Sequence, residues 1–289
     1  SDGQANQGIT DLNGLSRIVA QLTQKESVLS SIGMGLDFNE TLMSSLADYG
    51  MGSYAYLENL SGLGDIFTSN LNATRNIFAA NSHISITLTN GIELIDAGGY
   101  PISKGEHNRF NIKTGQLLSH SDKKFVMTLK VTPQETGNIS IGKLSLNYQV
   151  QGKNLQQDFA AQALTLAVVK PEQQQEAIAS INHDVYKQSV LKNNLGRMQK
   201  QLSHWLRQGN KDKADEVISS YRDELSKAEQ KIAMPLASAE MDKKLNEMES
   251  RVDDAFSGNH VDQEVKRKRA AKSIQMGSIK EQRMIKSHK

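Results

Sequence analysis

Hydrophobic positions in the first eighty residues follow two alternating spacings. From Thr10 to Thr23 they recur every three or four residues, which predicts an amphipathic helix. Val28–Met34 is short and mostly apolar, as is typical of a strand buried in a parallel sheet. Helical spacing returns over Asn39–Tyr49 and again from Ser61 to about Asn72. Helices that alternate with strands predict an α/β fold for residues 1–80.

In residues 82–169 apolar and polar residues alternate instead, and turn residues divide the pattern into short segments. Asn90-Gly91 is a strong hairpin signal, and Gly98-Gly99 and Gly152-Lys153-Asn154 mark further turns. Several short strands separated by turns predict an antiparallel β-sandwich. The apolar members of the alternation are Ile84, Ile86, Leu88, Ile92, Leu94, Phe125, Met127, Leu129, Val131, Leu144, Leu146, Tyr148, Val150, Leu164, Leu166 and Val168.

A third region starts at Lys170-Pro171, because proline disfavours a continuing strand and can open a helix. Residues 171–257 are predicted to be helical, and the helical hairpin around Gly209 resembles one tetratricopeptide unit. A further apolar stripe has the heptad spacing of a coiled coil, so it needs a second helix. That partner is either the stripe from Val217 to Ile232 or the same helix in another copy. The heptad stripe consists of Met241, Leu245, Met248, Val252 and Ala255.

Charge adds a fourth segment at the end of the chain. Residues 258–289 carry nine basic and three acidic residues, and we predict a basic tail there. The cluster Val265–Lys272 is a candidate for contact with anionic membrane lipid, although such tails are usually only solvated. The formal net charge of the whole chain is only +2, and no nucleic acid is expected as a partner.

The residues needed for several kinds of chemistry are missing from the sequence. The absence of cysteine excludes disulfides, thiolate metal sites and a cysteine nucleophile. No two of the seven histidines have the i, i+4 spacing of a helical zinc site, so we expect each to be solvated or structural. No Gly-x-Ser-x-Gly motif frames a serine nucleophile. We therefore expect that the protein is not an enzyme. The acidic Asp37–Glu40 segment is predicted to be a helix start with Asn39 as the N-cap.

The first six residues, Ser1-Asp2-Gly3-Gln4-Ala5-Asn6, open the most specific pattern in the chain. After the first predicted helix come a strand that ends in Gly33-Met34-Gly35 and a helix that starts at Asn39-Glu40. The strand Gly52-Ser53-Tyr54-Ala55-Tyr56 and a last helix follow. This order resembles the C-terminal half of a von Willebrand factor type A domain in its bacterial form, as far as about residue 80.

The resemblance extends into the second region, because the bacterial family carries a β-sandwich after its type A domain. Gly91–Leu94 followed by Gly99-Tyr100-Pro101 is similar to the opening hairpin of that sandwich. The expected fold is therefore a multidomain α/β, all-β and α chain. It combines a partial, Rossmann-like parallel sheet at 1–80, a sandwich at 82–169, a helical hairpin or coiled-coil-like segment at 171–257 and the basic tail.

The family holds a divalent cation through an Asp-x-Ser-x-Ser loop, a threonine from a later loop, and the aspartate of the Asp-Gly loop. Only the last is present, as Asp2, which the resemblance marks as the metal ligand of this chain. Gly3, Asn6 and Asp11 would form the rim of the ligand site. One carboxylate cannot fill a Mg²⁺ or Ca²⁺ shell. The cation is thus expected in the full-length protein, and whether this chain binds one is left open.

The sequence starts with serine, so we expect a fragment or a processed product that lacks the N-terminal half of the type A domain. The resemblance implies a non-catalytic, adhesion-type module that binds a protein ligand through the cation. The alternative is a structural or assembly protein that self-associates through its C-terminal helices, with a type A half that binds no metal. An extracytoplasmic or membrane-associated bacterial location is favoured, and the cytoplasm is left open.

Overall fold

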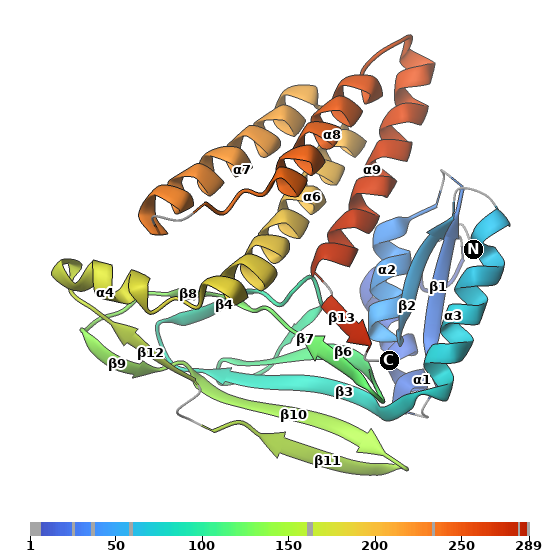
Figure 1. The fold of residues 1–289 in the computed structure, drawn as a ribbon. Coiled ribbons are helices and arrows are strands. Elements are labelled where there is room, and N and C mark those ends of the chain that lie inside the picture. The colour runs from blue at the N-terminus through green and yellow to red at the C-terminus, as the bar shows by residue number, and fades with distance from the viewer. Residues whose placement is uncertain are drawn as a thin grey trace. The chain divides into compact units, whose positions relative to one another are not determined.

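The computed structural model describes residues 7–24, 27–35, 38–57, 60–160, 164–232, 235–282 and 284–287. The chain divides into two compact units, and each is described by itself (Figure 1). The first unit comprises residues 1–168 together with 285–289, and the second comprises residues 169–284. The short strand β13 (Met284–Ser287) pairs with β7 (Ser121–Lys124).

The first unit starts with alternating helices and strands, as the hydrophobic spacing predicts. These are α1 (Leu12–Gln24), β1 (Leu29–Met34), α2 (Glu40–Tyr49), β2 (Met51–Leu57), the 3₁₀ turn η1 (Leu60–Gly62) and α3 (Leu63–Arg75). β1 and β2 pair in parallel. The Asn39 side chain accepts a hydrogen bond from the Leu42 amide at 3.0 Å, so Asn39 is the N-cap of α2, as predicted. At the other end, the Gly50 amide donates to the Leu46 carbonyl at 2.8 Å.

Antiparallel strands in two packed layers make up the rest of the first unit. They are β3 (Ile77–Leu88), β4 (Ile92–Asp96), β5 (Ile102–Lys104), β6 (Arg109–Leu118), β7, β8 (Thr128–Val131), β9 (Gly137–Ser140), β10 (Gly142–Val150), β11 (Lys153–Asp158) and β12 (Thr165–Val168). A five-stranded sheet has the order β11-β10-β3-β6-β5, while β4 pairs with β8 and β9 with β12. Ile86 and Phe110 of the large sheet pack with Ile92 and Leu129. An apolar core therefore lies between the large sheet and the β4–β8 pair.

The prediction of a β-hairpin at Asn90-Gly91 is wrong, because β3 and β4 do not pair with each other. The two residues do form a turn, with Gly91 at φ 83°, a value that glycine adopts readily. However, β3 pairs with β6 and β10, whereas β4 pairs with β8. The turn thus passes the chain from one layer to the other. The boundary expected between residues 80 and 82 also falls inside β3, which is one continuous strand.

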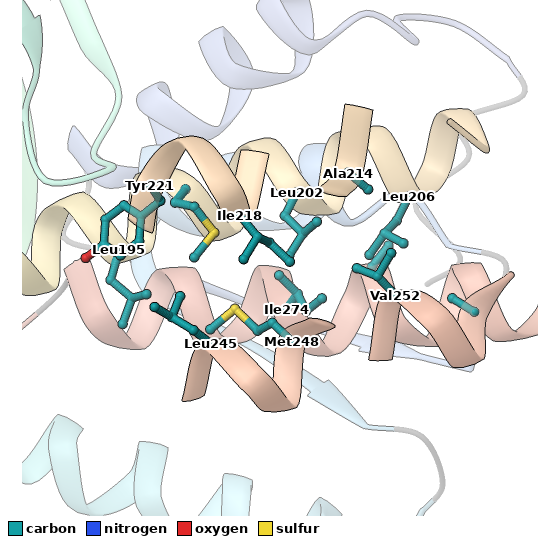
Figure 2. Packing of buried hydrophobic residues seen from close by; sticks show 13 residues of the cluster. Leu195, Leu202, Leu206, Ala214, Ile218, Tyr221, Leu245, Met248, Val252 and Ile274 are labelled. Atoms are coloured by element: carbon teal, nitrogen blue, oxygen red, sulfur yellow. The ribbon is translucent and has the colours of Figure 1, made fainter. Parts of the chain in front are cut away.

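The second unit is helical. Its elements are the 3₁₀ turn η3 (Pro171–Gln173), α4 (Gln174–Ala179), α5 (His183–Val185), the π-helical turn η4 (Tyr186–Val190), α6 (Leu191–Gln208), α7 (Lys211–Ile232), α8 (Ala239–Ala255) and α9 (His260–Gln282). Side chains from α6, α7, α8 and α9 converge on one apolar core (Figure 2). The heptad stripe of α8 lies in this core, and Leu245 and Val252 are fully buried there. The stripe is therefore covered within the chain, by α9 as well as by α7.

The segment expected to be a basic tail is instead the helix α9, which packs closely against α6. Small residues permit this approach. A Cβ atom on Gly196 would lie 3.0 Å from the Ser278 carbonyl oxygen and 2.4 Å from Gln282 Cγ. The Ser278 hydroxyl donates to the Gly196 carbonyl at 2.6 Å, and the Ser203 hydroxyl donates to the Ala271 carbonyl at 2.9 Å. Much of α9 is thus held by close, polar contacts and not by an apolar stripe.

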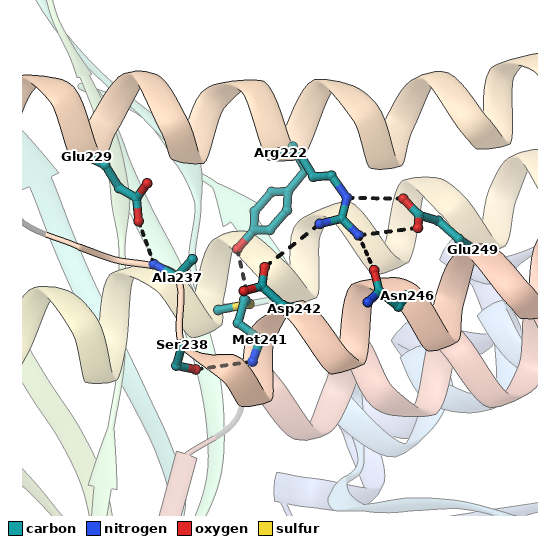
Figure 3. A network of polar contacts seen from close by, with 9 residues as sticks. Arg222, Glu229, Ala237, Ser238, Met241, Asp242, Asn246 and Glu249 are labelled. Carbon is teal, nitrogen blue, oxygen red and sulfur yellow. Dashed lines mark hydrogen bonds and ion pairs between the residues drawn. The ribbon is translucent and has the colours of Figure 1, made fainter.

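Polar contacts hold the connection between α7 and α8 (Figure 3). The Glu229 carboxylate accepts hydrogen bonds from the Leu236 amide at 2.7 Å and from the Ala237 amide at 2.8 Å. Farther along the two helices, Arg222 Nε donates to Glu249 at 3.1 Å. These contacts orient the two helices in the antiparallel arrangement that a short connection favours.

Candidate functional site

The ligand rim inferred from the resemblance is described only in part. Asp2, Gly3 and Asn6 lie outside the described residues. Asp11 is exposed and directly precedes α1, where its carboxylate accepts a hydrogen bond from the Gly14 amide at 2.8 Å. Asp11 therefore serves as the N-cap of α1. One oxygen of its carboxylate is already used in this role.

Asp11, the described member of the rim, lies at the edge of the sheet where α/β folds place their ligands. The Gly35 amide, just after β1, donates to the Leu57 carbonyl at the end of β2 at 3.1 Å. The carboxyl ends of β1 and β2 therefore lie side by side. Both α1 and α2 lead by short connections into a following strand, so the helix starts at Asp11 and Asn39 belong to this same edge.

The described residues do not fit a divalent cation. Among them, no group of three or more His, Cys, Asp or Glu side chains could hold a metal ion. Glu40, in the first turn of α2, is buried at 8 % exposure. Because a hard cation needs several oxygen ligands, a site at this edge would need Asp2 and ligands from outside the described part of the chain.

Two lysines of the basic cluster of α9 form ion pairs within the second unit. Lys266 Nζ lies 2.9 Å from an Asp254 oxygen, and Lys268 Nζ lies 3.0 Å from a Glu264 oxygen. These partners lower the pKa of both carboxyl groups, Asp254 through its hydrogen bond to Lys266 and Glu264 through its hydrogen bond to Lys268. Arg267 lies over the Phe256 ring, with its Cζ 5.7 Å from the ring centroid. Contact of this cluster with anionic membrane lipid stays a prediction.

Sequence reasoning missed a cleft of about 800 Å³ in the first unit, with polar and apolar residues in its lining. Strands β3, β6, β10 and β11 line it, together with residues from α1 and the first residue of β2. It contains His83, which the sequence analysis treated as solvated or structural, and Lys113, which carries no motif. The local sequence holds no signal for this cleft, because its residues come together only through strand pairing.

Comparison with known proteins supports the fold. No family model matches the sequence. Over 72 residues the chain is 32 % identical to "Uncharacterized protein YfbK" of Escherichia coli K12, an alignment that covers 25 % of this chain and 12 % of that protein. A solved structure, "von Willebrand factor type A from Catenulispora acidiphila", is similar with a TM-score of 0.59 and 13 % sequence identity. That similarity covers 92 % of this chain and 61 % of the other.

The chain therefore has a von Willebrand factor type A-like fold, the class that the opening residues indicate. It spans less than two thirds of either relative. Within the described residues, no helix is both long enough and apolar enough to cross a membrane.

Proposed function

We propose that the chain is a non-catalytic, protein-binding module of the type A class. The observation that carries this proposal is the structural similarity to a solved protein of the type A class, a similarity that covers 92 % of the chain. Folds of this class act generally as protein-interaction modules. The rim at the carboxyl ends of β1 and β2 is the surface that we assign to a protein ligand.

In this proposal Asp2 contributes to a Mg²⁺ or Ca²⁺ site, and Gly3, Asn6 and Asp11 surround the bound ligand. The other cation ligands come from residues outside this chain. An adhesion role follows if a carboxylate of the protein ligand completes the coordination shell of the cation. Because we propose an adhesion role, we keep an extracytoplasmic or membrane-associated location as our expectation.

The test is a calorimetric titration of Mg²⁺ into this chain and into a version extended to a complete type A domain. We expect saturable binding in the extended version, little or none in this chain, and loss of binding in the extended version on Asp2→Ala. Asp65→Ala is the matched control, because Asp65 lies exposed in the first turn of α3. If the extended version binds no cation, or if Asp2→Ala binds as before, the proposed site is wrong.

The second candidate is an assembly role for the helical unit, and a groove between α6 and α7 favours it. The groove has a volume of about 420 Å³, and Met198, Trp205 and Val217 contribute apolar surface among polar side chains such as Arg197 and Glu224. Sedimentation of the full chain over a range of concentrations tests this role. Self-association that Trp205→Ala abolishes would support assembly, whereas a monomer at all concentrations would oppose it.

A further inference from the structure

One face of the five-stranded sheet carries polar side chains in register across four strands. Asn147 of β10 is paired with Gln156 of β11 on one side and with His83 of β3 on the other. His83 is in turn paired with Lys113 of β6. Directly paired residues lie on the same face of a sheet, and neighbouring strands are about 4.8 Å apart. Gln156, Asn147, His83 and Lys113 therefore form one row along the floor of the cleft of about 800 Å³.

A second row of amides lies beside the first, and hydrogen bonds fix its orientation. The Asn81 side-chain amide donates to Gln149 at 2.7 Å, and the Gln149 amide donates to Asn154 at 3.1 Å. In the first row, the Asn147 amide donates to the Ser85 hydroxyl at 3.2 Å. These contacts hold several side chains of the cleft in place before any ligand arrives, which lowers the entropic cost of binding.

The backbone is irregular at the same place. The pairing of β3 with β6 shifts register between Ala79 and His83, and the pairing with β10 shifts between Asn147 and Gln149. Asn81 has φ 52° and Met51, at the margin of the cleft, has φ 57°. Bulges and left-handed non-glycine residues are concentrated at functional sites in proteins.

Lys113 supplies the charge of the cleft. Its ammonium group lies 3.4 Å from the Tyr49 carbonyl oxygen, at the end of α2, and 5.7 Å from the centroid of the Tyr49 ring. Within the described residues no carboxylate forms an ion pair with it, and no residue lining the cleft is acidic. Burial lowers the pKa of Lys113. The half-buried cation thus lacks an anionic partner, which a ligand could supply.

We propose that this cleft binds a hydroxylated carboxylate of the sugar-acid class. The ligand carboxylate would pair with Lys113, and its hydroxyl groups would bond to the amides of Asn81 and Asn147 on the two neighbouring strands β3 and β10. An amide side chain both donates and accepts hydrogen bonds, as a hydroxyl group does, so the two are complementary. The volume lies within the range of about 300–1,000 Å³ that is common for small-molecule sites. This proposal does not depend on the rim at the ends of β1 and β2.

The experiment is a titration of the full chain, labelled with ¹⁵N, with D-galacturonate, followed by calorimetry and by NMR. We expect saturable binding that shifts the side-chain amide signals of Asn81 and Asn147. D-galactose lacks the carboxylate and acetate lacks the hydroxyls, and each should bind at least about tenfold more weakly, because each loses part of the contacts. Lys113→Met should weaken galacturonate binding by at least about tenfold, while Lys143→Met, an exposed lysine on β10, should leave it unchanged.

Absence of galacturonate binding, or equal binding by Lys113→Met, would overturn the proposal. Equal affinity for inorganic phosphate would also overturn it, because the site would then select any anion. If Lys113→Met does not fold, the NMR shifts of the unaltered chain decide, and shifts confined to other regions count against the cleft. If digalacturonate binds more tightly than galacturonate, the natural ligand is the end of an acidic polysaccharide. If the two bind equally well, the natural ligand is a free sugar acid. Both of these last outcomes support the ligand class.

Discussion

Replacing Leu245 with alanine should destabilise the helical unit by about 3–5 kcal/mol. Leu245 has 0 % exposure and lies in a core built by α6, α7, α8 and α9. The substitution removes three carbon atoms, which cost about 2.4 kcal/mol at roughly 0.8 kcal/mol each. Because four helices surround the site, the core can collapse only partly, and the residual cavity raises the loss toward about 5 kcal/mol. This is a large fraction of the total stability of a typical domain, roughly 5–15 kcal/mol.

The assay is urea unfolding followed by the fluorescence of Trp205, which is the single tryptophan of the chain and packs against this core. The fluorescence therefore reports on the helical unit alone. At the usual slope of about 1–3 kcal/mol per molar urea, the midpoint should fall by roughly 1–5 M. Val261→Ala is the matched control, because Val261 is 71 % exposed on α9 and should change stability by less than about 0.5 kcal/mol.

Equal effects of the two substitutions would show that the α8 stripe is not packed within the chain. The more disruptive substitution Leu245→Asp tests the alternative that the α8 stripe joins two copies of the chain. If it converts a dimer to a monomer while the helical content stays the same, the stripe joins two copies and the intrachain packing is wrong. We expect instead a loss of helical content in a chain that is monomeric before and after the change.

Three further predictions concern other parts of the structure. Gly196→Ala should cost about 1–3 kcal/mol by forcing α6 and α9 apart, whereas the control Val261→Ala, at an exposed position of the same unit, should change stability by less than about 0.5 kcal/mol in the same urea assay. Glu229 has a lowered pKa because the amides of Ala237 and Leu236 donate to it, so its contribution to stability is present above its ordinary pKa of 4.5 and is lost as the pH falls through the lowered value. The stability difference between the unaltered chain and Glu229→Gln should therefore shrink on acidification, and a difference independent of pH would contradict this. Amides of β1, which pairs with β2 alone in the described sheet, should exchange with solvent faster than those of β3, which pairs on both sides, and slower exchange in β1 would refute the reasoning.

Local pattern was sufficient to predict most of the individual elements. Helices α1, α2, α6, α7 and α8 follow from spacings of three and four and from caps such as Asn39 and Gly209. The long strands β3 and β10 follow from alternation, because one of their faces meets an apolar core while the other stays polar. These features are local, since each depends on residues within one or two turns or strand repeats.

Helix α9 shows where this reasoning stops. Its inward residues include Ala271, Ile274 and Ser278, so no continuous apolar stripe marks the buried face. Gly196 of α6 lets the two backbones come close enough for polar contacts, and Ala271 and Ile274 reach the shared apolar core. Sequence periodicity reports only apolar burial, and the charges of Lys266 and Lys268 therefore indicated a solvated tail.

The two candidate sites differ in the same way. The sequence by itself determined the type A-like opening, because the family pattern from Asp2 to Tyr56 is contiguous and carried by local motifs. The cleft could be recognised only from the tertiary structure. His83, Lys113 and Asn147 are far apart along the chain, and strand register alone places them in one row. Register is set by bulges, turns and the packing of the opposite face, which are properties of the assembled sheet and not of any one strand.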